Sequence, residues 1–136
     1  MCRGSGYSAF AFSAVSLTFT TSFQVFAHEL GHQFGMQHQA EVASPTPAYS
    51  WSFAKTISDG TVQTVVGGYS LARTLQFSNP NVSFIGSGEA SGETFQFNAR
   101  TGACLAPTMS GFRTPGQLST LFSDGFELRL IPIGGC

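Results

Sequence analysis

All three histidines of the 136-residue chain fall within residues 28–38, which read HELGHQFGMQH. On an α-helix, residues four positions apart lie on one face, so His28 and His32 should project side by side. Gly35 can adopt the left-handed conformation that ends helices, and His38 would then follow from the chain beyond the helix. This stretch therefore predicts a helix, a sharp glycine turn and a return of the chain that brings three imidazoles together.

The residue types in this stretch are typical of a catalytic metal site. Three neutral imidazoles bind Zn²⁺ and leave a fourth tetrahedral position for water, whose pKa falls to about 7 in such sites. Glu29 lies one step round the helix from His28, where its carboxylate can contact that water as a general base. We therefore predict His28, His32 and His38 as Zn²⁺ ligands and Glu29 as the catalytic residue. A chance H-E-x-x-H among packed or surface histidines is the alternative, which the added Gly35 and His38 disfavour.

Composition limits the fold and the partners. The length fits one domain over residues 1–136, and fourteen phenylalanines favour a packed core. A net charge of −1 and six scattered Lys and Arg residues provide no basic stripe, so nucleic acid and membranes are not expected partners. A protein or peptide is the expected substrate. Cys2, Cys104 and Cys136 contain no C-x-x-C spacing and permit one disulfide with a spare thiol.

The segment before the histidines has two interpretations. Met1 to Ala27 could be a signal peptide cleaved after Ala27, but cleavage there would remove the first turns of the metal-binding helix. In the favoured interpretation, Tyr7 to Phe19 alternates as a half-buried strand, and a capping box from Thr21 to Gln24 begins the helix. The helix then carries an apolar stripe predicted to lie in the core, formed by Phe23, Phe26, Ala27, Leu30 and Phe34.

The remainder of the chain predicts short strands and loops. Residues 49–53 alternate as an extended segment, and residues 62–66 suggest a strand that ends in a turn at Gly67 and Gly68. Closely spaced glycines and prolines from Gly102 onward argue against a long helix, so residues 102–136 are predicted as a loosely structured tail. The overall prediction is an α+β fold with the metal helix packed on a small sheet and an irregular, loop-rich C-terminal part.

Two runs of sequence resemble one known family. Residues 26–38 resemble the active-site helix of the reprolysin (adamalysin-like, M12B-type) metzincins, particularly their secreted bacterial relatives. Residues 73–75 and the FSNPNVSF run at 77–84 resemble the family segment that passes beneath the metal. The resemblance implies a partial zincin-like (metzincin) domain, secretion, Zn²⁺ and hydrolysis of peptide bonds. It also implies that Glu29 passes a proton to the leaving amine.

The chain departs from the family pattern in three places. A methionine turn of T-I-M-x-Y type is lacking, because Leu75-Gln76-Phe77 runs almost directly into the FSNP segment. Gln39 stands where reprolysins usually have aspartate after the third histidine. Few residues precede the metal helix, so we expect a truncated catalytic domain.

Three functional hypotheses follow. The first is a zinc endopeptidase in which Glu29 activates a water on the metal. The second is a non-catalytic zinc-binding remnant that acts as a binding module. The third is a different zinc hydrolase in which Glu89 or Glu93 replaces His38 as the third ligand.

Overall fold

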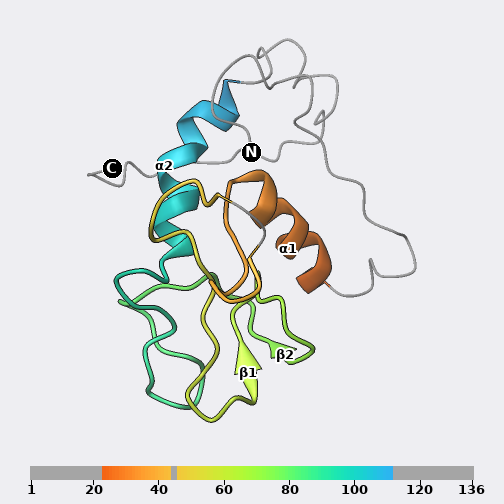
Figure 1. The fold of residues 1–136 in the computed structure, drawn as a ribbon, viewed down its shortest axis with the longest axis vertical. Coiled ribbons are helices and arrows are strands. Elements are labelled where there is room, and N and C mark those ends of the chain that lie inside the picture. The colour runs from red at the N-terminus through yellow and green to blue at the C-terminus, as the bar shows by residue number, and fades with distance from the viewer. Residues whose placement is uncertain (1–22, 44–45, 112–136) are drawn as a thin grey trace, which may run out of the picture.

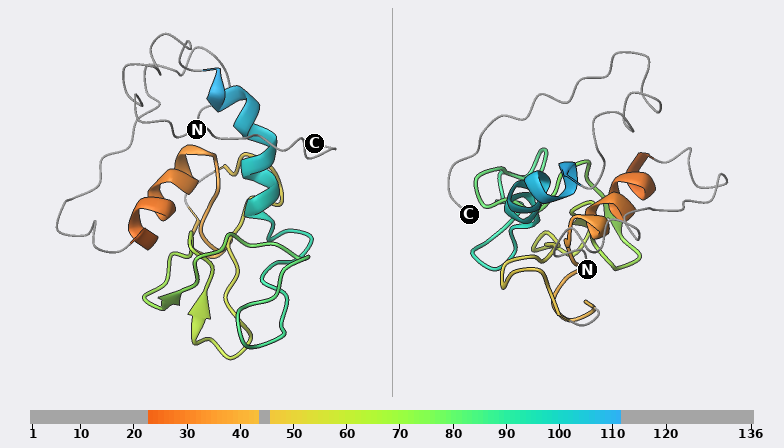
Figure 2. Two further views of the ribbon diagram at one scale, coloured as in Figure 1. Left: turned by 180° about the vertical axis from the view of Figure 1, so that it is seen from behind. Right: turned by 90° about the horizontal axis from the view of Figure 1, so that it is seen from above.

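A computed structural model describes residues 23–43 and 46–111, and its elements follow the order α1, β1, β2, α2 (Figure 1). They span Phe23–Gln33, Val62–Gln63, Ala72–Arg73 and Asn98–Ser110, respectively. The helices occupy one half of this part of the chain, and the strands with their loops occupy the other (Figures 1 and 2). Two helices and a small two-stranded parallel sheet agree with the predicted mixture of helix and strand. Within the described part, no helix is long and apolar enough to cross a membrane.

The end of α1 follows the prediction made for Gly35. Gly35 has a φ of 72°. Its N–H donates to the His32 carbonyl at 2.9 Å, and the Met36 N–H donates to the Gly31 carbonyl at 3.0 Å. This pair of hydrogen bonds is a Schellman motif, which reverses the chain direction at the end of a helix. The predicted cap at Thr21 and the predicted strand from Tyr7 to Phe19 lie outside the described residues.

The apolar stripe of α1 is only partly buried, which corrects the prediction of a continuous core face. Ala27 and Phe34 pack against the buried cluster of Met36, Val65 and Val66. Phe26 and Leu30, in contrast, are 54% and 39% exposed. Within residues 23–43 and 46–111, the two strands contain two residues each, and strands of that length cannot cover a three-turn helix.

A tight turn after β1 packs against α1 at Gly31. β1 pairs in parallel with β2, in the register Val62 to Ala72 and Gln63 to Arg73. The turn at residues 64–67 is closed by the Gly67 N–H, which donates to the Thr64 carbonyl at 2.8 Å. These residues match the predicted strand that ends in a turn, although the strand is shorter than expected. The turn contains no methionine, and the fully buried Val66 lies under the helix instead.

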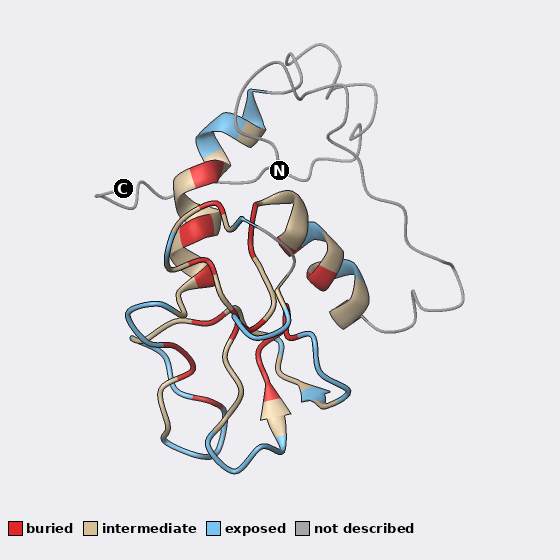
Figure 3. Cartoon of the chain, in the orientation of Figure 1, coloured by how far each residue is buried: buried red, intermediate tan, exposed pale blue. Residues whose placement is uncertain are grey.

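Helix α2 corrects the prediction of irregular chain from Gly102 onward. It runs through Gly102 and Pro107 to Ser110. One face is buried at helical spacing by Asn98, Thr101 and Leu105, and Figure 3 shows this buried face directed toward the rest of the fold. Tertiary packing of one face outweighs low intrinsic propensity, and Pro107 lies on the exposed side. The prediction of a loosely structured tail is therefore wrong for residues 102–110, which belong to α2. Residues 112–136 lie outside the described residues.

The packing of α1 on the turn gives a testable prediction at Gly31. A Cβ there would lie 2.7 Å from Val66 Cγ2 and 3.2 Å from Phe77 Cε1. Alanine is favoured over glycine in helices by about 1 kcal/mol, but overpacking costs about 1–3 kcal/mol. We expect Gly31→Ala to lower the free energy of unfolding, measured in urea. Gly111→Ala is the control, because its Cβ would approach no described atom closer than 3.5 Å. Equal stability of both variants would contradict the close packing.

Candidate metal centre

The three histidines converge at one point, as the sequence predicts. Their Nε2 atoms form a triangle with sides of 3.1 Å between His28 and His32, 3.0 Å between His32 and His38, and 3.3 Å between His28 and His38. His28 is buried, and the other two rings are half-buried. Three ligand atoms so close together could hold one metal ion.

Backbone carbonyls fix two of the rings. The Nδ1 of His28 lies 2.8 Å from the Val65 carbonyl oxygen, and the Nδ1 of His32 lies 2.9 Å from the Met36 carbonyl oxygen. A carbonyl only accepts hydrogen bonds, so in each ring Nδ1 carries the hydrogen and donates it. In the neutral imidazole, Nε2 then presents a bare lone pair to the shared centre.

The triangle fits a zinc ion. A tetrahedral site with Zn–N bonds of about 2.0–2.1 Å separates its nitrogen ligands by about 3.3 Å. The observed separations of 3.0–3.3 Å are close to this value. Lone pairs directed at each other over this distance repel, and a cation between them removes the repulsion. The donor set of neutral imidazoles and its spacing therefore suit a borderline-soft ion such as Zn²⁺.

The third ring is placed by pairing of the chain beyond α1. Gln37 N–H donates to the Ser52 carbonyl at 2.9 Å, and the Ala54 N–H approaches the carbonyls of Gln37 and His38 at 3.0 and 3.2 Å. The side chain of Asn98, at the start of α2, accepts from Gln37 N–H at 3.4 Å and donates to its carbonyl at 3.0 Å. His38 is therefore delivered on a segment that is held on both sides.

Burial favours the metal-binding form of His28 and His38. Burial is the largest cause that lowers the pKa of His28 below its ordinary value of 6.5, opposed by the hydrogen bond to Val65. Burial also lowers the pKa of His38, and electrostatic repulsion between its protonated form and the neighbouring histidines adds to the effect. A lowered pKa favours the neutral ring, which is the form that a metal requires.

Glu29 lies beside the cluster without joining it. Its side chain is half-buried, and its negative charge acts on His28 and His38, where it raises both pKa values slightly against the larger effect of burial. The group of residues that could hold a metal consists of the three histidines and does not include this carboxylate. The carboxylate of Glu29 is therefore not part of the cluster, and its role as a general base stays a prediction.

The alternative with Glu89 or Glu93 as the third ligand has no support in the structure. Both carboxylates pair with the ammonium group of Lys55, Glu89 at 3.6 Å and Glu93 in a closer contact. Glu89 also accepts hydrogen bonds from the backbone and hydroxyl of Ser58. These interactions hold both carboxylates in a cluster with Lys55 that is separate from the three histidines. The group of residues that could hold a metal contains His38 and neither of these glutamates.

The sequence did not reveal several groups that support the site. The Val65 carbonyl and the side chain of Asn98 lie 37 and 61 residues from the positions they hold. A Cβ on Gly68 would lie 2.8 Å from the His38 ring, so this glycine permits the ring to pack against the backbone. The Gly67-Gly68 pair was the one local signal, because adjacent glycines mark close backbone approach as well as turns.

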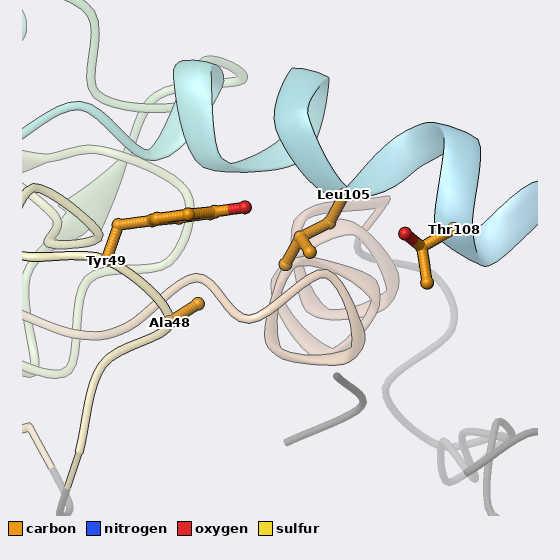
Figure 4. A pocket seen from close by; sticks show the side chains of 4 residues that line it. All are labelled: Ala48, Tyr49, Leu105 and Thr108. Atoms are coloured by element: carbon orange, nitrogen blue, oxygen red, sulfur yellow. The ribbon is translucent and has the colours of Figure 1, made fainter. Parts of the chain in front are cut away.

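A hollow elsewhere in the described structure is not lined by any of the three histidines. It has a volume of about 270 Å³ and is lined by Ala48, Tyr49, Leu105 and Thr108. Figure 4 shows the Tyr49 ring and Ala48 facing α2 across it. Its lining offers two hydroxyl groups and no carboxylate, imidazole or thiol, and among the described residues the histidine cluster is the group that could hold a metal.

The sequence of this chain matches the profile of a known protein family. The sequence profile described as metallo-peptidase family M12B, reprolysin-like, matches residues 2–94. The matched region covers more than half of the chain and contains the three histidines and Glu29. No curated protein and no solved structure matched the chain. With the converging histidines, the profile match shows that the chain belongs to the reprolysin-like M12B family of metallopeptidases.

Proposed function

We propose that this protein is a zinc-dependent endopeptidase. The observation that carries the proposal is the triangle of Nε2 atoms with sides of 3.0–3.3 Å, formed by His28, His32 and His38. Two rings are fixed as Nδ1–H tautomers, so the site has the donor set and spacing of an open three-histidine zinc centre. Membership of a metallopeptidase family supports a protein or peptide as the substrate.

In the proposed hydrolysis of a peptide bond, zinc and the carboxylate of Glu29 would have different roles. When bound, zinc supplies Lewis acidity that polarises a carbonyl and acidifies water. Glu29 would accept a proton from the attacking water and later deliver it to the leaving amine. Its half-buried position beside His28 and His38 supports this role. His28 and His32 would hold the ion without taking part in proton transfer, because the Nδ1 of each ring already donates to a backbone carbonyl.

The second candidate function is a zinc-binding remnant that cleaves nothing. The observation that favours it is the size of the sheet, because the two described strands contain only two residues each. Extended substrates commonly pair with a sheet edge, and such short strands offer few backbone groups for this pairing. The two candidates predict the same metal binding and differ in turnover.

We also propose an extracellular location. The support is the resemblance of residues 26–38 to secreted bacterial reprolysins, together with the disulfide bond of Cys104 on α2. Disulfides persist mainly in oxidising compartments, and secreted proteins are the commonest case.

Zinc content and turnover test the proposal together. We expect the purified chain to retain one zinc per molecule by elemental analysis, and we expect His32→Ala to lose it. Glu29→Gln should keep the metal and lower the rate of cleavage of an unfolded protein substrate by about 10²–10⁴-fold, since a general base contributes about that much. Zinc retention with no cleavage by the unaltered chain would support the remnant instead. Absence of retained zinc would contradict both candidates.

The lowered histidine pKa values predict the pH dependence of zinc binding. Because the pKa values of His28 and His38 lie below 6.5, these two rings should stay available to zinc as the pH falls to 6.5, and their protonation should weaken zinc binding at lower pH. In the metal-free protein, the unfolded chain binds more protons than the folded chain below pH 6.5, so these two groups contribute stability above that pH and lose it as the pH falls. Competition titrations with a zinc-sensitive dye would measure the affinity. A decline that is already complete above pH 6.5 would contradict the direction of these shifts.

A further inference from the structure

Two buried glutamines form a hydrogen-bonded pair behind the third histidine. Gln39 is 3% exposed and Gln63 is fully buried. Gln39 Nε2 donates to Gln63 Oε1 at 3.0 Å and to Thr56 Oγ1 at 2.7 Å. Gln39 Oε1 accepts from the Gly68 N–H at 2.9 Å. Gln39 therefore links its own backbone, which directly follows His38, to the backbone of Gly68.

The side chain of Gln63 also forms hydrogen bonds with the backbone of the loop that follows the turn. Its Nε2 donates to the carbonyls of Tyr69 at 2.6 Å and Leu71 at 3.2 Å, and its Oε1 accepts from the Tyr69 N–H at 3.2 Å. A Cβ on Gly67 would lie 2.1 Å from the same Oε1, so the loop can wrap around this amide only with glycine at that position. All donors and acceptors of the two amides are engaged, so the burial of this pair leaves no polar group unsatisfied.

The backbone held by these amides forms one wall of the metal centre. A Cβ on Gly68 would lie 2.8 Å from both Cγ and Nδ1 of His38, so the ring packs directly on this backbone. Arg73 secures the same wall, because its Nε and Nη2 donate to the Gly67 carbonyl at 3.3 and 3.1 Å. We call Gly67 and Gly68 the glycine wall.

His38 depends on this wall more than the other two rings do. His28 and His32 are each oriented by a hydrogen bond from Nδ1 to a carbonyl. Within the described structure, the only hydrogen-bond-distance contacts of the His38 ring are those of Nε2 with the other two histidines. Packing against Gly68 is therefore what fixes the angle of the His38 ring.

We propose that Gln39 and Gln63 are positioning residues of the metal centre, whose paired neutral amides hold the glycine wall against His38 and thereby set the affinity for zinc. The inference rests on the proposed zinc site. It adds two residues that do not bind the metal and that hold the backbone behind one of its ligands. A carboxylate at position 39 could accept from Gly68 but could not donate to Gln63 or Thr56. Its oxygen would instead face the Gln63 oxygen, and burying a negative charge there would be costly.

Zinc affinity of the full-length chain tests this inference. Gln39→Met keeps the length of the side chain and removes its hydrogen bonds, and Gly68→Ala pushes directly on the ring. Partners that orient metal ligands typically contribute 10–100-fold to affinity, so we expect each variant to weaken zinc binding by about that factor. Because both act on one contact, the double variant should weaken binding by less than the product of the two single effects.

Thr101→Val is the matched control for loss of a buried hydrogen bond. The Thr101 hydroxyl lies 2.8 Å from the Ser52 hydroxyl and belongs to α2 rather than to the glutamine pair. This variant should lower the melting temperature and leave the zinc dissociation constant unchanged. The visible absorption of the Co²⁺-loaded protein should change in Gln39→Met, since it reports ligand geometry, and should not change in Thr101→Val.

Each outcome separates the inference from the proposed function. If the unaltered chain binds no zinc, the proposed function fails. If it binds zinc, but Gln39→Met and Gly68→Ala bind with the affinity of the unaltered chain, the positioning role is wrong while the zinc site stands. Equal weakening in Thr101→Val would also overturn the inference, because the effect would then follow general stability.

Discussion

The contact between Val66 and the glycine face of α1 is the constraint on which the metal centre depends. Only a helix without a side chain at Gly31 allows the turn at residues 64–67 to lie so close to it. That distance places the Val65 carbonyl 2.8 Å from His28 Nδ1, and the next two residues of the turn lead into the glycine wall beside His38. One apolar contact therefore sets the position of two of the three rings.

The histidine cluster is supported mostly by neutral groups, with Arg73 as the charged group that holds the Gly67 carbonyl. Carbonyls of Val65 and Met36 orient two imidazoles, and amides of Gln39 and Gln63 hold the backbone behind the third. Burial is the largest cause that lowers the pKa values of His28 and His38, and it favours the unprotonated form of these two rings. Where the family usually has aspartate, Gln39 contributes through packing and hydrogen bonds to the backbone.

Local rules predicted part of this structure well. The i and i+4 spacing of His28 and His32, and the left-handed turn at Gly35, follow from helix geometry and from the conformational freedom of glycine. Rules of the same kind failed for α2, because glycine and proline propensities are worth less than the burial of a helix face. They also failed for Phe26 and Leu30, because a periodic apolar stripe does not show whether a large sheet is present to cover it.

The sequence by itself determined the family and the identity of the three converging histidines, since these depend on residue types at short, fixed separations within one helix and one turn. Only the tertiary structure decided what holds those rings. The hydrogen bonds of the Val65 carbonyl, the Asn98 amide and the glutamine pair join residues that lie 24 to 61 positions apart in the sequence. No periodicity connects such positions, and their pairing follows from the need to satisfy buried polar groups once the chain has folded around them.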